Sequence, residues 1–252
     1  MALIDISTTP TGLLTVKLTR PEAKNALNLE MVRAFREALV RGVDGKPPRA
    51  VVLKSGVAGV FSIGMDLAAL EAGIGGGATS PDVYEATREY VALLKDIVSA
   101  RCLTIAVVDG VAVGGGVDLA SSCDFLFASD RAAFSVAQLR KGIFPLTTSG
   151  VVVPRIGERA FLYWALSGQN WSAKKALKMG LVTQNWPAAE LDGRVQQFVD
   201  QVLGYNREAL QLGIDALRMH HGMRPEDRLE HLGALLALNC QIPRGSRKKE
   251  AG

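Results

Sequence analysis

The chain has 252 residues, of which 48% are hydrophobic and 21% are charged, and this profile excludes a disordered or a fibrous protein. A chain of this length can form one large domain with a sizeable buried core. Most of the net charge of +4 comes from residues 244–250, so the body of the chain is nearly neutral. Without a basic stripe interleaved with aromatics, or an apolar run of about 18 residues, we expect no nucleic-acid partner and no membrane span.

The first half of the chain alternates predicted strands and helices. Residues 12–19 alternate apolar and polar side chains and predict a strand. Asn28 is a suitable N-cap for a helix to about residue 41, because apolar side chains follow it at helical spacing. Residues 50–55 predict an apolar strand, and Ser80 followed by Pro81 predicts the start of a helix to about residue 99.

The segment 103–110 is the most apolar of the predicted strands, so we expect it near the centre of a sheet. Three glycines at 114–116 end it, and the chain then restarts as a helix. Short strands are expected in 124–129 and 132–136.

The last third of the chain changes character. Ser172 is predicted to cap a short helix that ends at Gly180, and three helical stretches follow at about 188–204, 206–221 and 225–239. One α/β core in residues 1–186 with a helical C-terminal region in residues 187–252 explains this order.

The cysteines and histidines indicate neither a disulfide framework nor a metal site. Three cysteines are widely spaced without a CxxC pair, which is typical of a reducing compartment, and we expect a cytoplasmic protein. The N-terminal residues also lack the pattern of a secretory signal. All three histidines lie in 220–231 without a second ligand cluster, so we expect no metal there.

Two segments combine features that a reaction site needs. FSIGMDL at 61–67 ends a strand, and VDGVAVGGGVDLA at 108–120 is a strand that breaks into glycines before a helix. Glycines at such junctions let a ligand approach the backbone, and free N–H groups at a helix start favour negative charge. A single glycine cluster is better explained by a tight turn, so the argument depends on the two segments together.

With RPEAKNAL at 20–27 ahead of them, these segments resemble the crotonase superfamily, also called the enoyl-CoA hydratase/isomerase family. FSVAQLRKGIFP at 134–145 and SAKKALKMGLV at 172–182 continue the resemblance, which runs from about residue 10 to 240. It implies an α/β fold, a crotonase-like spiral of ββα units with a helical C-terminal trimerisation region. It also implies that the ligand is an acyl-coenzyme A thioester.

By position, the resemblance assigns the oxyanion hole of the family to the backbone N–H groups of Met65 and Gly115. Most reactions of the family pass through a thioester enolate, and two preorganised donors suit that charge. Asp66 is then the residue that helps to fix the loop of Met65.

The resemblance assigns a second group of residues to coenzyme A itself, which is part of the substrate, and no separate cofactor is implied. The residues so assigned are Lys24, Ala26, Ser62, Ile63 and Gly64. Lys24 occupies the place where the family often meets the CoA phosphates, and Ser62, Ile63 and Gly64 line the adenine pocket largely through their backbone.

The proton-transfer groups match the family only in part. The first of the two glutamates of hydratases falls on Asp118, and the second falls on Gln138, which does not exchange a proton at neutral pH. The sequence GGGVDL is most similar to that of dienoyl-CoA isomerases. Those enzymes also use acids at the positions of Gln138 and Leu146. Asp118 is therefore the remaining carboxylate, with bracing of the helix start as its structural alternative.

A further set of titratable side chains lies in the helix predicted after Pro81. Tyr84, Glu85 and Arg88 are spaced to be neighbours on one helical face, and the resemblance places this helix near the acyl pocket. A solvated helix face is the default interpretation, and Tyr84 is the candidate retained from this set.

We predict an enzyme, a CoA-thioester lyase or isomerase, in which Asp118 moves a proton or orients water and Gln138 orients substrate or water without ionising. Hydration by two acids is disfavoured, whereas a proton shift, a decarboxylation or a C–C cleavage needs only one carboxylate. A catalytically weak acyl-CoA-binding or assembly subunit is the alternative from another class. A dinucleotide site at GIGGGA, 73–78, lacks the strand that should precede it.

The helices after Pro187 carry more apolar residues than one buried face needs. We expect them to pack against neighbouring subunits, and the resemblance implies a homotrimer or a homohexamer.

Overall fold

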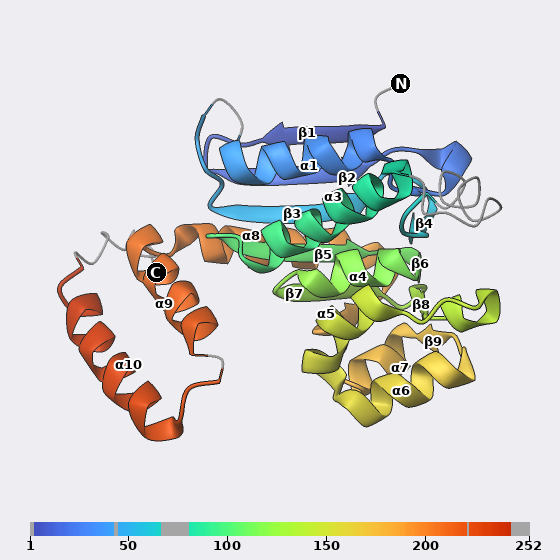
Figure 1. Ribbon diagram of the computed structural model, residues 1–252. Coiled ribbons are helices and arrows are strands. Elements are labelled where there is room, and N and C mark those ends of the chain that lie inside the picture. The colour runs from blue at the N-terminus through green and yellow to red at the C-terminus, as the bar shows by residue number, and fades with distance from the viewer. Residues whose placement is uncertain (1–2, 43–44, 67–80, 221, 243–252) are drawn as a thin grey trace.

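The computed structural model describes residues 3–42, 45–66, 81–220 and 222–242. Its described part contains two β-sheets, a set of helices that cover them, and a helical arm at the C-terminal end (Figure 1). Ser80 and the GIGGGA segment at 73–78 lie outside the described residues.

The larger sheet has six strands in the described part of the chain. They are, in sheet order, β1 (Ile4–Thr8), β2 (Leu13–Leu18), β3 (Ala50–Ser55), β5 (Leu103–Val108), β7 (Phe125–Ser129) and β10 (Gln184–Trp186). β1 runs antiparallel to β2, and all other neighbours are parallel. β5 is an inner strand, which confirms the expectation from its apolar sequence.

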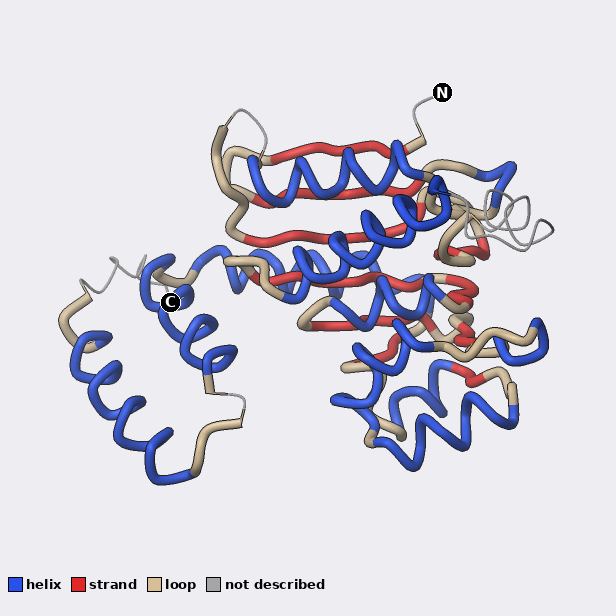
Figure 2. Tube along the Cα trace, in the orientation of Figure 1, coloured by secondary structure: helices blue, strands red, loops and turns tan. Residues whose placement is uncertain are grey.

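The smaller sheet has four strands among the described residues. They are β4 (Gly59–Ser62), β6 (Gly110–Val113), β8 (Ala133–Ser135) and β9 (Trp171–Ser172). The pairs β3–β4, β5–β6 and β7–β8 each give one strand to each sheet before the chain enters a helix, and this repeat builds the spiral (Figure 2).

The segment 103–110, predicted as one strand, contains β5, Asp109 and the first residue of β6. The chain bends at Asp109, and β6 leaves the larger sheet for the smaller one. Gly110 has φ +145, and a Cβ there would lie 2.3 Å from the carbonyl carbon of Gly59. Glycine is therefore needed where the two strand layers cross, and hydrophobicity alone did not indicate this bend.

The helices connect and cover the strands. They are α1 (Leu29–Arg41), α3 (Pro81–Val98), α4 (Gly115–Ser122), α5 (Leu146–Ile156), α6 (Glu158–Ser167), α7 (Ala173–Lys178), α8 (Ala188–Gly204), α9 (Arg207–Met219) and α10 (Pro225–Asn239), with short 3-10 turns η1 (Pro21–Ala23) and η2 (Gln138–Lys141). The Asn28 and Ser172 caps are confirmed: their side chains accept from the backbone N–H of Met31 and Lys175. α5 and α6 were not predicted, because β-branched residues and an internal Pro154 obscure the helical pattern of α5.

The core lies on both faces of the larger sheet. Val51 and Leu53 of β3 pack into the cluster that contains α1 and α3, and the alternate residues Ala50 and Val52 pack with α8. Figure 1 shows α1, α3 and α4 in front of the strands and α8 behind them. Although α8 begins at the predicted boundary near residue 187, it packs against the sheet, and the boundary itself stays a prediction.

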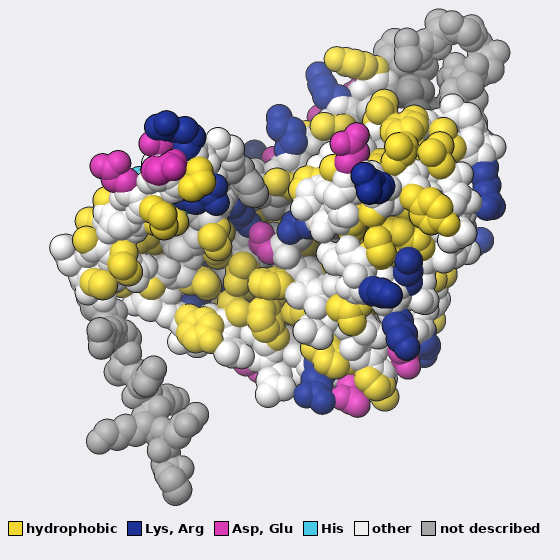
Figure 3. Space-filling view, turned by 90° about the horizontal axis from the view of Figure 1, so that it is seen from below, with side chains coloured by type: hydrophobic (Ala, Val, Ile, Leu, Met, Phe, Trp, Pro, Cys, Tyr) yellow, Lys and Arg dark blue, Asp and Glu magenta, His cyan; other side chains and the backbone are white. Residues whose placement is uncertain are grey.

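α9 and α10 form an arm that extends from the body (Figure 1). Arg218 near the end of α9 holds it there, donating to the Asp124 carboxylate at 2.8 Å and to the carbonyl of Ala100. His220 and His231 join the two helices through ring nitrogens 2.9 Å apart. Figure 3 shows hydrophobic side chains over this arm. Among the described residues, no helix has both the length and the apolarity to cross a membrane.

Candidate active site

An isolated parallel β-bridge between Leu27 and Met65 sets the direction of the Met65 N–H. The Leu27 N–H donates to the Gly64 carbonyl at 2.7 Å, and the Asp66 N–H donates to the Leu27 carbonyl at 3.0 Å. In a parallel bridge of this kind the middle residue, Met65, turns its own N–H away from the partner strand. That N–H therefore points to the other side of the loop, where α4 begins.

Two glycines bring this loop against the start of α4. Gly64 has φ +90, and a Cβ on it would lie 2.6 Å from the backbone nitrogen of Gly115. A Cβ on Gly115 would lie 3.1 Å from the backbone nitrogen of Met65. The N–H groups of Met65 and Gly115 thus lie side by side on backbones that only glycine allows to approach so closely.

Neither N–H has a backbone hydrogen-bond partner within the described part of the chain. For Gly115 this follows from its place as the first residue of α4, since the first N–H groups of a helix have no partner inside it. Two adjacent free donors at the positive end of a helix form a site for a carbonyl oxygen that gains negative charge. The geometry brings together the two residues that the sequence assigned to this task.

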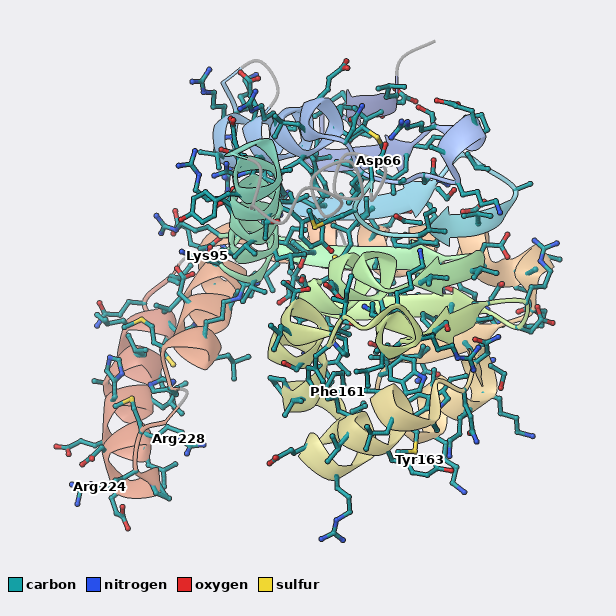
Figure 4. All side chains as sticks on the ribbon, turned by 45° about the vertical axis from the view of Figure 1, so that its right-hand side comes forward. Asp66, Lys95, Phe161, Tyr163, Arg224 and Arg228 are labelled. Carbon is teal, nitrogen blue, oxygen red and sulfur yellow. The ribbon has the colours of Figure 1, made fainter. Side chains whose placement is uncertain are left out.

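The Met65 loop is braced from the RPEAKNAL segment. Arg20 donates to the Asp66 carboxylate at 2.7 Å and to the Ala26 carbonyl at 2.9 Å. Figure 4 marks Asp66 close to the N-terminal elements that carry these residues. This ion pair ties the Met65 loop to the RPEAKNAL segment. Arg20 was not singled out from the sequence, although it opens that motif and carries the charge that pairs with Asp66.

The residues assigned to coenzyme A surround the same loop. The Ser62 side chain is fully buried, donating to the Asn25 carbonyl at 2.7 Å and accepting from the Gly64 N–H at 3.0 Å. The Ile63 N–H donates to the Lys24 carbonyl at 3.3 Å, and both of these side chains are exposed. Ser62 hence braces the loop from inside, and Lys24 and Ile63 are the members of the set that present side chains to solvent.

Asp118 is a buried carboxylate in the first turn of α4, three residues after Gly115. Its side chain is 1% exposed, and Oδ2 accepts from the Thr147 hydroxyl at 2.5 Å. Oδ1 is buried without a hydrogen-bond partner. Burial raises the pKa of Asp118 to about 6, although hydrogen bonds from Thr147 and its neighbours act in the opposite direction. This carboxyl can therefore gain and lose a proton near neutral pH.

Gln138 begins η2 and packs against the glycine turn. Its Nε2 donates to the Thr148 hydroxyl at 3.3 Å, and its Oε1 is buried without a partner. A Cβ on Gly114 would lie 3.1 Å from this Nε2, so the amide packs directly on the residue before Gly115. The neighbouring threonines 147 and 148 of α5 thus hold Asp118 and Gln138 respectively. The sequence prediction missed both, because α5 itself was not recognised.

The tyrosine of helix α3 that lies in the site is Tyr90 and not Tyr84. Tyr84 is 68% exposed, and the Glu85 carboxylate pairs with Arg33 of α1 at 2.6 Å. Tyr90 is 1% exposed and its hydroxyl donates to the Gly115 carbonyl at 2.7 Å. The helical spacing of Tyr90 with buried Leu93, Leu94 and Ile97 was the available signal for this inward face.

The remaining candidates do not join the site. Arg88 lies 3.9 Å from Glu89, and its side chain is 64% exposed. Leu146, at the start of α5, is 72% exposed. Within the described ranges, no three His, Cys, Asp or Glu side chains are grouped so that they could hold a metal ion. Of the candidates that the described ranges contain, Asp118 is the buried carboxylate in the helical turn that carries the Gly115 N–H.

Residues 8–231 match the family model described as enoyl-CoA hydratase/isomerase. The chain is 31% identical to 4-chlorobenzoyl coenzyme A dehalogenase-2 of Arthrobacter sp over 192 residues, 76% of this chain and 69% of the relative. It is 27% identical to the probable mitochondrial enoyl-CoA hydratase of Dictyostelium discoideum over 223 residues, 86% of this chain and 78% of the relative. An enoyl-CoA hydratase structure from Mycobacterium smegmatis superposes with a TM-score of 0.87 at 26% identity, covering 96% of this chain and 93% of that one.

Proposed function

Because the chain belongs to the enoyl-CoA hydratase/isomerase family, we propose that it shifts a proton within an enoyl-CoA thioester through an enolate intermediate. The N–H groups of Met65 and Gly115 hold the thioester oxygen as it becomes an enolate. Asp118 takes the proton from the acyl chain and returns it. Coenzyme A enters as part of the substrate, against the loop of Lys24 and Ile63.

The observation that carries this proposal is the state of Asp118. It is buried, its pKa is raised to about 6, one of its oxygens has no partner, and it sits in the same helical turn as Gly115. A base whose pKa lies near the working pH is ionised often enough to accept a proton and acidic enough to give it back.

The proton balance of the reaction requires only this one group. Asp118 removes a proton from the α-carbon of a 3-enoyl-CoA, and the electron pair moves into the thioester to form the dienolate. The protonated Asp118 then delivers the same proton to the γ-carbon, so the double bond moves from the β,γ to the α,β position. The oxyanion donors stabilise the dienolate, and the removal of one such donor typically costs about 2.7–4 kcal/mol.

Water addition is less well supported by these residues. Hydration uses a base to activate water and an acid to protonate the α-carbon, and the amide of Gln138 does not exchange a proton at neutral pH. The role proposed for Gln138 is to orient the acyl group or a water molecule beside Asp118.

We also propose that the protein assembles as a homotrimer or a homohexamer through the α9–α10 arm. The support is the exposure of large apolar side chains there, including Leu229 at 70%, Leu236 at 64% and Leu217 at 73%. A surface of this kind in an isolated chain favours contact with another protein.

Two measurements on purified protein test the reaction. The first follows the conversion of 3-hexenoyl-CoA to 2-hexenoyl-CoA, and the second follows exchange of the α-protons of butyryl-CoA in D₂O by mass spectrometry. We expect both to occur, and we expect Asp118→Asn to lower both at least a hundredfold. Asp192→Asn is the matched control, since that carboxylate is 82% exposed on α8, and it should leave both rates within twofold.

Each other result has a definite meaning. Exchange without isomerisation would point to decarboxylation or C–C cleavage, which form the same enolate. Binding of butyryl-CoA without exchange would point to an acyl-CoA-binding or assembly subunit. No thermal stabilisation by any acyl-CoA at millimolar concentration would overturn the assignment of the ligand.

A further inference from the structure

We propose that Tyr90 is a positioning residue for the oxyanion hole, holding Gly115 through the hydrogen bond from its hydroxyl to the Gly115 carbonyl. The inference rests on the proposed function, because it concerns how the same hole is kept in place. The inference goes beyond the proposed function by assigning a task to a side chain of α3, an element that contributes neither the N–H donors nor the carboxylate.

Tyr90 touches the backbone at the point where the two donors meet. A Cβ built on Gly115 would lie 2.8 Å from the Tyr90 hydroxyl, 3.0 Å from the Gly64 Cα and 3.1 Å from the Met65 nitrogen. The phenol therefore forms one wall of the space at Gly115, and the Met65 loop forms another. Any shift of Gly115 away from Met65 would stretch or break the 2.7 Å hydrogen bond to Tyr90.

The Tyr90 hydroxyl donates to the Gly115 carbonyl and also faces the Asp118 carboxyl, whose pKa it acts to lower. Tyr90 is fully buried, and burial together with the negative charge of Asp118 raises its pKa well above the usual value, so the phenol stays protonated. The proton goes to the Gly115 carbonyl. Tyr90 is therefore assigned no proton transfer, and the effect proposed for it is the one exerted through Gly115, beside its direct interaction with Asp118.

The helix that carries Tyr90 is itself firmly attached. The Arg36 guanidinium of α1 binds Glu89 at 2.5 Å and Asp96 at 2.7 Å, so it spans two turns of α3 around Tyr90. The exposed fractions of the two carboxylates are 16% and 24%, and partly buried pairs of this kind are screened less than surface pairs. A rigid α3 lets one phenol fix the start of α4, and preorganised donors stabilise an enolate better than mobile ones.

The test compares Tyr90→Phe with Tyr84→Phe, which removes a hydroxyl from the same helix at a position 68% exposed. Infrared difference spectra of bound butyryl-CoA labelled with ¹³C at the thioester carbonyl report how strongly the hole polarises that bond. Exchange of its α-protons in D₂O reports the reaction, and calorimetry reports the dissociation constant.

For Tyr90→Phe we expect at least a tenfold slower exchange, a dissociation constant within threefold of wild type, and loss of part of the shift of the carbonyl band to lower wavenumber. Tyr84→Phe should match wild type in all three. Replacement of Tyr90 by 3-fluorotyrosine, which keeps the hydroxyl, should restore both exchange and the band shift. A purely structural role would change the melting temperature without changing the carbonyl band of the bound thioester.

The result against the proposal is a folded Tyr90→Phe protein with the wild-type band shift and exchange within twofold. If Tyr90→Phe does not fold, the fluorotyrosine protein decides, because a folded protein that keeps the hydroxyl but loses both exchange and the band shift also contradicts the proposal. If wild type itself shows neither exchange nor a band shift, the proposed function fails first. The two failures are therefore distinguishable.

Discussion

The start of α4 and the α9–α10 arm are both exceptions to the rule that charged side chains are exposed and large apolar ones are buried. The first buries a carboxylate, and the second exposes leucines. At α4 a carboxylate is 1% exposed and one of its oxygens has no partner. On the arm, none of the described residues of α10 is buried, and several leucines are more than half exposed. Burial of an ionisable group costs free energy unless it is compensated, and so does the exposure of large apolar side chains. The first exception supports the role proposed for Asp118, and the second supports the assembly proposed for the arm.

The largest expected effect comes from placing a methyl group in the space beside Gly115. Gly115→Ala places a Cβ against the Tyr90 hydroxyl, the Gly64 Cα and the Met65 nitrogen, so the two N–H donors separate. We expect the exchange of acyl-CoA α-protons to fall by about 10²–10³, which corresponds to about 2.7–4 kcal/mol. The control is Gly193→Ala in α8, where a Cβ would meet nothing within 4 Å. Equal exchange rates for both variants would contradict the assigned hole.

The second largest effect concerns assembly through the α9–α10 arm, which is tested independently of the site. Leu229→Glu with Leu236→Glu puts two charges on α10, and we expect it to weaken assembly by at least about 3 kcal/mol, because each buried leucine contributes about 1.5–3 kcal/mol. Light scattering should give three or six times the 26.9 kDa chain mass for wild type and one chain mass for the variant. Val40→Glu, at a 68% exposed position at the end of α1, should leave the assembly intact. A wild-type monomer at micromolar concentration would refute the arm as an interface.

A third effect concerns the cost of the buried carboxyl. The folded-state pKa of Asp118, about 6, lies above its unfolded value of about 3.9, so ionisation destabilises the folded protein as pH rises from about 4 to above 6. Asp118→Asn removes this cost, and we expect a gain of up to about 3 kcal/mol at pH 7 and almost none at pH 4. Thermal unfolding at both pH values checks this, with Asp192→Asn as the control. A gain independent of pH would show that ionisation is not its source.

The smallest effect tests Gln138. Gln138→Glu restores an ionisable group of nearly the same shape beside Asp118, and the two acids could then act as base and acid around one water. We expect hydration of crotonyl-CoA to rise at least tenfold, which is about 1.4 kcal/mol of barrier. Asp118→Asn in the same background should remove the gain. If the Gln138→Glu protein binds acyl-CoA normally and gains nothing, residue 138 does not face the β-carbon.

Local sequence was enough for the features that depend on neighbouring residues. The helices 188–204 and 225–239 were predicted with the bounds of α8 and α10, because caps and apolar spacing act within a few turns. The family motifs also gave the places of Met65, Gly115, Asp118 and Gln138, since a resemblance aligned in order carries positions along the chain. The structure then brought these four positions around one glycine turn.

The amino-acid sequence by itself thus determined where most helices lie, and it supplied the candidate residues for the proposed chemistry. Only the tertiary structure decided which tyrosine of α3 faces inward, that the neighbouring threonines of α5 hold Asp118 and Gln138, and that the strand at 103–110 bends into a second sheet. These features depend on contacts between segments far apart in the chain, such as Tyr90 with Gly115 and Gly110 with Gly59. Local propensity carries no information about such contacts, because their energy arises only when packing brings the segments together.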